Sequence, residues 1–332
     1  PNPSFYGWRV LLAGLVLAAL SGPGQSYLLS LYIDDLTESL SLTRLDISAL
    51  YGAATILAAL ILPWIGALAD RWSSRVFAGT VLALLGLAVL SLSMAKGLWT
   101  VAFAFFALRL LGQGAISLGI VTTVVRWFLR YRGRAFAVVS AGYATGEAIF
   151  PSVAVVLIAA LGWRGSLVTL AVLYVFLFAP LLAWSMRERD PETEPLDGTT
   201  EAPSERVAGL YTDVSWEPKE ALRTPVFWTL LICSCISPFL LTGLIFHMPA
   251  IFRSAGWDVA VAPRAFAAYA VAGMASTYLM GLLLERVHSR IGLTVSLLAL
   301  AIGVATLFFP FGATNGPWLF GAALGGSAGV SH

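Results

Sequence analysis

Long apolar runs follow one another along almost the whole chain, and this pattern constrains the fold more than any other feature. Nine of these runs are poor in charge and about 20 residues or longer, the length of a helix that crosses the hydrocarbon core of a membrane. They cover approximately residues 8–33, 46–69, 76–95, 98–125, 135–161, 164–186, 224–252, 265–284 and 291–314, and a tenth begins near Gly316. We therefore expect an all-α membrane protein.

The composition agrees with lipid as the solvent on one side of the helices. Hydrophobic residues make up 58% of the chain and charged residues only 11%, whereas soluble domains carry about 25% charged residues. The net charge of +2 is small, and no Lys/Arg-rich arm with aromatic residues is present, so we expect no binding of nucleic acid. Cys233 and Cys235 lie two residues apart on an expected helix and point to nearly opposite sides, so they predict neither a disulfide nor a metal site.

Residues 187–223 form the one long link between apolar runs. They contain ten acidic residues and four prolines, which is typical of a solvated linker. The linker separates a six-helix bundle, residues 1–186, from residues 224–332, which hold helices 7–10. Because the chain begins at Pro1 without Met and stops at His332 inside an apolar run, we expect a fragment whose second bundle has about four of six helices.

Basic residues are distributed unevenly over the two sets of links, and this bias predicts the orientation. Fourteen Lys and Arg residues lie on the side of the N-terminus and of the linker, and five lie on the opposite side. Since basic residues are enriched in cytoplasmic loops, we expect the N-terminus and residues 187–223 in the cytoplasm.

A charged motif between the second and third runs recurs in the second half of the chain. Gly66-Ala-Leu-Ala-Asp-Arg-Trp-Ser-Ser-Arg75 shares Gly, Leu, Arg, Ser and Arg with Gly281-Leu-Leu-Leu-Glu-Arg-Val-His-Ser-Arg290 at the same places, with Glu285 in place of Asp70. A repeat this far apart in apolar surroundings indicates two homologous halves.

This organisation resembles the major facilitator superfamily over essentially the whole chain. Gly66–Arg75 resembles the loop 2–3 signature of that family, Arg109-Leu-Leu-Gly-Gln-Gly114 its fourth-helix motif, and Gly142-Tyr-Ala-Thr-Gly146 with Pro151 its glycine-rich fifth helix. The resemblance implies two pseudo-symmetric helical bundles that move a solute by alternating access. It also implies a gate, in which Asp70 pairs with nearby cations such as Arg126 or Arg130, or with a helix N-terminus. The gate residues would be Gly66, Asp70, Arg71, Arg75, Gly281, Glu285, Arg286 and Arg290. The alternative is that these charges only anchor helix ends at the membrane surface.

Two further stretches, Trp127–Ala135 and Phe246-His247-Met248-Pro249, resemble the prokaryotic branch akin to monocarboxylate porters. This resemblance implies a multi-pass protein of a prokaryotic cytoplasmic (inner) membrane that carries a small organic anion. Porters of the animal type have an Asp and an Arg on the eighth helix, where this chain has Gly273 and Thr277. An uncoupled facilitator or an exporter of hydrophobic compounds therefore stays open as the alternative.

Only two charged residues, Arg109 and Glu147, lie deep in apolar runs, where a charge needs a partner or a water-filled cavity. Counted from the turn near Arg130 they lie at similar depth on neighbouring antiparallel helices, so we expect that they can form an ion pair. We predict that Arg109 binds the negative group of the substrate and that Glu147, displaced by the substrate, takes up a proton. The alternative is a static pair that fixes helix packing.

Four more polar residues are candidates for the substrate site: Gln25, Tyr27, Gln113 and His247. Gln25 and Tyr27 follow Gly22-Pro-Gly24, which predicts a bend in the first helix, and broken helices near the midplane often line transporter sites. His247 can exchange a proton near neutral pH. The alternative for each is packing: a hydrogen-bonded histidine, and side chains that satisfy carbonyls freed by the bend.

Signals of an enzyme are weak. Gly325-Gly-Ser-Ala-Gly329 fits G-x-S-x-G but follows no expected strand, and the sequence contains no H-E-x-x-H and no Walker-type phosphate loop. We therefore expect a monomeric secondary transporter without cofactor or metal, whose partners are a small molecule, protons and the lipid bilayer. A membrane receptor or sensor of the same fold is the alternative from a different class, and a membrane enzyme is the weakest.

Overall fold

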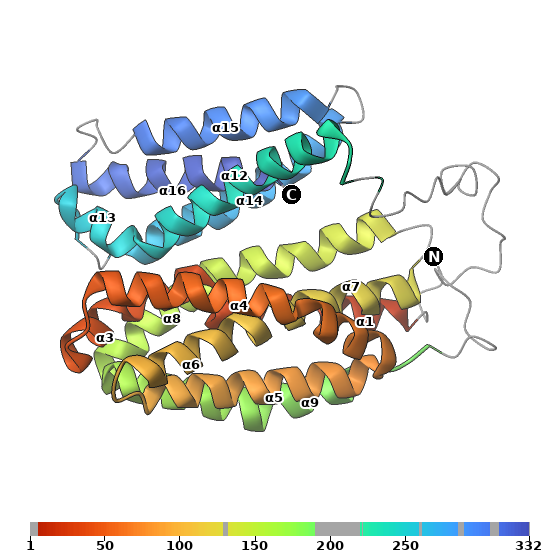
Figure 1. The fold of residues 1–332 in the computed structure, drawn as a ribbon, viewed down its shortest axis with the longest axis horizontal. Coiled ribbons are helices and arrows are strands. Elements are labelled where there is room, and N and C mark those ends of the chain that lie inside the picture. The colour runs from red at the N-terminus through yellow and green to blue at the C-terminus, as the bar shows by residue number, and fades with distance from the viewer. Residues whose placement is uncertain are drawn as a thin grey trace. The chain divides into compact units, whose positions relative to one another are not determined.

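The computed structural model describes residues 6–128, 132–189, 220, 222–258, 261–284, 289–305 and 312–331, and these residues form helices with short connections and no strand (Figure 1). The chain divides into two compact units, residues 1–200 and 201–332. The division falls inside the expected linker, and each unit is described by itself below.

The first unit begins with a helix that is interrupted. It consists of α1 (Gly7–Ala19), the 3₁₀ turn η1 (Gly22–Gly24), α2 (Ser26–Leu29), the 3₁₀ turn η2 (Ser30–Tyr32) and α3 (Ile33–Leu40). We call Gly7–Leu40 the broken helix and residues 20–25 its break. The break lies at the bend that Gly22-Pro23-Gly24 predicts, because Pro23 has no N–H for a helical hydrogen bond and Gln25 adopts an extended backbone.

The other helices of the first unit follow as antiparallel crossings. They are α4 (Arg44–Arg71), α5 (Ser74–Ser93), α6 (Leu98–Leu108) continued by the π-helix η3 (Arg109–Ala115) and α7 (Ile116–Trp127), then α8 (Arg132–Val172), the π-helix η4 (Leu173–Phe178) and α9 (Ala179–Ser185). Polar caps begin two of them: Thr43 and Asp46 form a capping box at α4, and the Ser73 hydroxyl accepts from Val76 N at α5.

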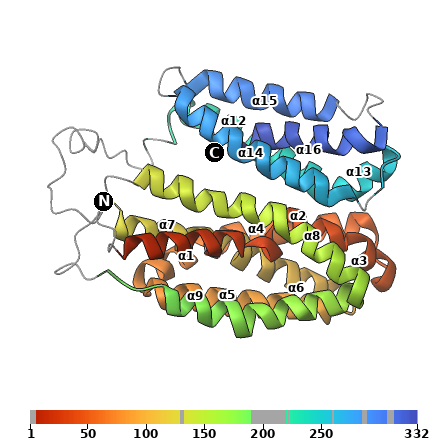
Figure 2. The same ribbon diagram turned by 180° about the vertical axis from the view of Figure 1, so that it is seen from behind.

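Five segments of the described residues are long and apolar enough to cross a membrane: Gly7–Leu40, Arg44–Arg71, Ser74–Ser93, Leu98–Trp127 and Arg134–Ser185. The last has 52 residues, which as one helix would extend about 78 Å at ~1.5 Å per residue, far more than the ~30 Å hydrocarbon core. Gly162, with φ 68° and ψ 170°, breaks it, and Figure 2 shows the chain turning back between the first part of α8 and α9. Each of the six apolar runs of the first half thus corresponds to a helical crossing.

The second unit contains α12 (Pro225–Phe246), α13 (Met248–Ser254), α14 (Ala262–Leu284), α15 (Ser289–Ala305) and α16 (Gly312–Ser331). The expected boundary between the last two helices is wrong, because α15 ends at Ala305 and α16 begins at Gly312. The uncharged residues 312–316 hide this boundary from a hydropathy argument. Helices α14 and α16 cross with their backbones in contact: a methyl group on Gly321 would lie 2.1 Å from the Ala265 carbonyl oxygen.

Candidate functional site

Arg109 is a buried charge at the start of the π-helical turn η3, in the middle of the α6–α7 crossing. Its side chain is 4% exposed. Nη1 donates to the carbonyl oxygen of Gly24 at 3.0 Å and Nε donates to the hydroxyl of Thr55 at 3.0 Å. The guanidinium carbon lies 4.8 Å from the centre of the Tyr51 ring, a cation–π distance. π-helical turns occur frequently at functional sites, and here the turn begins at Arg109.

The partners of Arg109 are themselves held in place. The hydroxyls of Tyr51 and Ser26 share a hydrogen bond of 2.5 Å, and Thr55 donates back to the Tyr51 carbonyl oxygen at 2.8 Å. Only two of the five guanidinium N–H groups are thus engaged by residues that the structure describes. Arg109 is fixed in orientation and keeps donors for a further acceptor.

Sequence reasoning missed Tyr51 and Thr55. A signal was present, because these two residues are four positions apart in an otherwise apolar run and so lie on one face of α4. No argument from the sequence alone places that face toward Arg109.

The break of the broken helix packs tightly against η3. A methyl group on Gly24 would lie 2.4 Å from the Leu108 carbonyl oxygen and 2.6 Å from Cα of Gly112. Only glycine permits this approach, and it brings the Gly24 carbonyl to Arg109. Gln113, one residue after Gly112, shares this contact only through its backbone nitrogen, 2.9 Å from the same methyl position, and the residue is exposed.

Gln25 and Tyr27, expected as substrate ligands, lie within or beside the break. The Gln25 amide donates to the Ser21 hydroxyl at 3.1 Å, which ties one side of the break to the other. Tyr27 is 4% exposed. Its hydroxyl lies 3.2 Å from the position of a methyl group on Gly22 and 3.1 Å from one on Gly146 of α8. Tyr27 therefore sits between the break and α8.

The expected ion pair between Arg109 and Glu147 is wrong. Among the described residues the ion pairs are Arg44–Asp34 and Arg126–Glu188. Sequence spacing gives an estimate of depth but not the direction of a side chain around its helix, and Arg109 points toward α4 and the break. Glu147 is half-buried on α8, four residues before Pro151 and on the same face as Tyr143.

His247 belongs to the second unit and lies between α12 and α13. It is half-buried, and its ring meets that of Phe246 edge-on with 5.3 Å between the centres. It caps the end of α12, where its backbone N–H donates to the Gly243 carbonyl. The structure thus places His247 in a helix connection.

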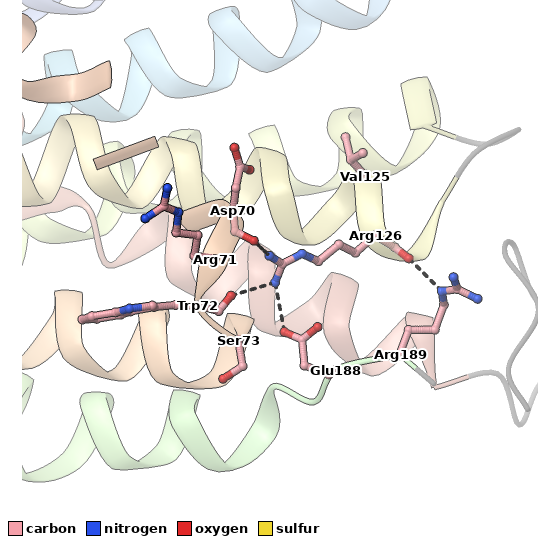
Figure 3. Close-up of a pocket in the computed structure, with 8 residues that line it drawn as sticks. All are labelled: Asp70, Arg71, Trp72, Ser73, Val125, Arg126, Glu188 and Arg189. Carbon is pink, nitrogen blue, oxygen red and sulfur yellow. Dashed lines mark hydrogen bonds and ion pairs between the residues drawn. The ribbon is translucent and has the colours of Figure 1, made fainter. Parts of the chain in front are cut away.

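A second polar site lies where α4 ends and α5 begins. A pocket of about 590 Å³ is lined there by Asp70, Arg71, Trp72, Ser73, Val125, Arg126, Glu188 and Arg189 (Figure 3). Its centre is Arg126, at the end of α7. Nη2 donates to the carbonyl oxygens of Ala69 and Asp70 at 3.0 and 2.8 Å, and Nη1 donates to that of Trp72 at 3.1 Å. Arg126 therefore caps the unsatisfied carbonyls at the C-terminus of α4.

Glu188 completes the contacts of Arg126. Its carboxylate lies 3.0 Å from Nη1 of Arg126 and also accepts from the backbone N–H of Ser74, the first residue of α5. Arg189 in turn donates to the Arg126 carbonyl at 3.0 Å. We call Arg126, Glu188 and Arg189 the clasp, since they join the ends of α4, α5 and α7 to the chain that follows α9.

The expected gate residues lie around the clasp in an unexpected arrangement. Arg126 contacts Asp70 through the backbone carbonyl, while the Asp70 carboxylate points away from the guanidinium (Figure 3). Arg71 and Arg75 are exposed. Gly66 packs against Leu118, since a methyl group on Gly66 would lie 3.8 Å from the Leu118 side chain. Glu188 was missed; its only signal is a lone acid between two arginines directly after the sixth apolar run.

Part of the second copy of the motif cannot be compared with the first. Gly281 lies on α14 and Arg290 on α15. Glu285, Arg286 and the candidate partner Arg130 lie outside the described residues.

Comparisons with known proteins support one family and one fold. The family model described as Major Facilitator Superfamily matches residues 10–331. A comparison with curated proteins finds no match. A bacterial homologue of the human lysosomal transporter Spinster is similar in structure, in its inward-facing, unoccupied conformation, with a TM-score of 0.76 and 19% identity over 100% of this chain and 74% of that one. Its inward-facing, occupied conformation gives a TM-score of 0.74 and 17% identity over 98% of this chain and 73% of that one. At this level of identity the similarity is one of fold.

Proposed function

Because the chain belongs to the major facilitator superfamily, we propose that this multi-pass membrane transporter moves a small organic anion, of the monocarboxylate class, together with protons by alternating access. The observation that carries the proposal is Arg109, a charge buried in an apolar bundle, held by two neutral acceptors and with no ion pair among the described residues. Such a charge is costly unless it serves a solute.

Arg109 would bind the anion with its remaining N–H groups. A guanidinium presents donors in a planar fork that matches the two oxygens of a carboxylate. Thr55 and Gly24 would keep the fork oriented, so little conformational entropy is lost on binding. The Tyr51 ring would cover one face of the guanidinium and exclude water from it.

Glu147 would carry the proton at a separate place. A carboxyl group within an apolar helix is less costly when neutral, and Glu147 has no ion pair with any described residue. Since Arg109 is not paired with Glu147, the substrate would not have to displace the carboxylate. The anion and the proton would instead bind at two groups and influence each other through the protein.

The clasp and the neighbouring motif residues would act as the gate on the cytoplasmic side. Three helix ends meet at Arg126 and Glu188. Opening at this end must therefore either break these contacts or move the joined helix ends together. We further propose a monomer in a prokaryotic inner membrane with the N-terminus and residues 187–223 in the cytoplasm, as the excess of basic residues on that side favours.

A second candidate is an uncoupled facilitator or an exporter of hydrophobic compounds. It is favoured by α14, where the acid and the arginine of animal-type porters are replaced by Gly273 and Thr277. The two candidates differ in whether a pH gradient drives accumulation.

The test is uptake of radiolabelled lactate, pyruvate and benzoate by the full-length protein in liposomes with an imposed pH gradient. We expect saturable, gradient-driven accumulation by the wild type. Arg109→Gln should lower the affinity for the anion about 100-fold, if it removes one charge-assisted fork worth ~3 kcal/mol. Glu147→Gln should lose accumulation without losing exchange. Lys96→Gln, which removes an exposed charge away from the site, is the control. Equal uptake by wild type and Arg109→Gln would exclude the assigned role of Arg109. Uptake that does not depend on the pH gradient would favour the uncoupled facilitator.

A further inference from the structure

We propose that the break of the broken helix, residues 20–25, is the element that couples anion binding at Arg109 to proton binding at Glu147. This inference rests on the proposed function. It starts from an observation that the site itself does not explain: the two candidate residues do not touch, but both helices that carry them touch the same short segment. Contact on both sides makes the break a physical link.

On one side the break is tied to Arg109. The Gly24 carbonyl accepts from Nη1 of Arg109, and the backbone of Gly24 lies against Leu108 and Gly112, with a methyl group on Gly24 2.4 Å from the Leu108 oxygen. An anion that draws the guanidinium toward itself weakens the bond to Gly24. The Gly24 carbonyl must then find another donor, because a buried carbonyl without a partner costs about 1–3 kcal/mol.

On the other side the break and the residues next to it are packed against α8 beside Glu147. A methyl group on Gly146 would lie 2.6 Å from the Ala19 carbonyl oxygen and 3.1 Å from the Tyr27 hydroxyl, and one on Gly22 would lie 3.0 Å from the Phe150 ring. These distances leave no room between the broken helix and α8, so the break cannot shift without moving Gly146. Glu147 is the next residue along α8, so its carboxyl moves with it.

The backbone around the break can take up such a shift. Pro23 and Pro151 each lack an N–H, so the broken helix and α8 both lose a helical hydrogen bond at this level, and α8 loses the one that the Glu147 carbonyl would accept. By contrast, the carbonyl of Leu20, the first residue of the break, accepts from the buried Tyr174 hydroxyl at 2.7 Å. The start of the break is therefore anchored, and its far end, at Gly24, is the part that responds to Arg109.

Few other titratable groups lie on the elements packed against this part of α8. Those in the described interior are four tyrosines, and the arginines of the same elements lie at helix ends. They are Tyr27, Tyr32 and Tyr174 with Arg9, Arg75 and Arg126, and α8 itself carries Tyr143, Arg132, Arg134 and Arg164. Glu147 is thus the one carboxyl group there that can report a change in the position of the break.

The experiment measures the linkage between the two ligands directly. Binding of radiolabelled lactate to the full-length protein in detergent is measured at pH 5.5 and at pH 8, and the ratio of the two dissociation constants gives the coupling. Coupled sites typically change each other's affinity by about 5–150-fold. We expect a ratio in this range for wild type and a ratio near 1 for Tyr27→Phe and Gly24→Ala.

The matched control is Tyr32→Phe. It removes another buried hydroxyl of the broken helix, one whose hydrogen-bond partner is Ser166, at 3.1 Å, on a later part of α8. Gly24→Ala can fail to fold because the added methyl group meets backbone; Tyr27→Phe adds no atom, so it decides the question in that case. The inference is supported if Tyr27→Phe loses the pH dependence and Tyr32→Phe keeps it.

Two results would overturn the inference, and they separate it from the proposed function. If wild type is pH-dependent and Tyr27→Phe is equally so, the break does not couple the sites, while proton-coupled transport stands. If wild type binds lactate with the same affinity at both pH values, or does not bind it, the proposed function itself fails and the inference falls with it.

Discussion

Arg126 is the residue whose loss should most weaken the first unit at the end where α4 meets α5. We consider two substitutions: Arg126→Gln, which removes the charge, and Arg126→Lys, which keeps it. Arg126 donates to three backbone carbonyls, to the Ser74 hydroxyl and to the Glu188 carboxylate. A lysine ammonium is a compact donor that cannot reach acceptors on both sides of the pocket at once.

The expected cost can be worked out from these contacts. The side chain of Arg126 is 25% exposed and that of Glu188 is 45% exposed, so the ion pair itself contributes about 0.5 kcal/mol. The larger part comes from the carbonyls at the C-terminus of α4, at about 1 kcal/mol for each neutral acceptor, since water replaces part of what is lost. We expect Arg126→Gln to lower the free energy of unfolding by about 3 kcal/mol and Arg126→Lys by roughly two thirds of that.

Thermal unfolding of the purified protein, followed by the fluorescence of a thiol-reactive or tryptophan probe, measures this cost. A loss of 3 kcal/mol corresponds to a shift of the midpoint on the order of 6–12 °C for a unit of this size. Arg71→Gln is the control, because Arg71 is the exposed neighbour in the same pocket and makes no hydrogen bond to a described residue. The reasoning is refuted if Arg126→Gln melts within about a degree of wild type, or if Arg71→Gln melts as early.

Two further predictions test the helix connections. Gly162 has φ 68° and ψ 170°, a region that only glycine occupies readily, so Gly162→Ala should destabilise the protein by about 1–3 kcal/mol, whereas Gly52→Ala, in open space on α4, should not; equal melting of the two variants would contradict this. Gly321→Val places atoms where the Ala265 carbonyl lies, 2.1 Å from the added Cβ, so it should separate α14 from α16 and lower expression of folded protein. Gly326→Val, whose Cβ meets nothing within 4 Å, should leave the yield of folded protein in size-exclusion chromatography unchanged.

The Arg109 site shows where prediction from the sequence stops. Its burial follows from one arginine in an apolar run, and the break follows from Gly22-Pro23-Gly24, because both are local properties of chain and solvent. The partners of Arg109 do not follow. Thr55 and Tyr51 approach Arg109 only because α4 presents one particular face to it. If α4 were rotated by 100° about its axis, other residues would face Arg109 and the hydropathy of the helix would be the same.

The same limit explains why the expected Arg109–Glu147 pair was wrong and why the Arg126–Glu188 pair was missed. Spacing along a helix allows an estimate of depth, and it gives a similar depth for Arg109 and Glu147. The angle of a side chain around the helix axis depends instead on how the helices pack. Hydropathy does not reveal that angle, because lipid-facing and protein-facing residues are both apolar. The Arg126–Glu188 pair was missed for a related reason. It joins residues 62 positions apart, and no local pattern connects the end of α7 with the chain that follows α9.

The sequence by itself indicated that lipid is the solvent, that the described chain is helical, where its first helix breaks and which family the motifs belong to. These conclusions depend on hydropathy, proline and glycine, whose effects act within a few residues. Only the tertiary structure decided what the buried arginine touches, that it does not meet Glu147, and which carboxylate closes the end of the first unit. Those contacts depend on how helices rotate against one another, and that rotation is set by the packing of many side chains together.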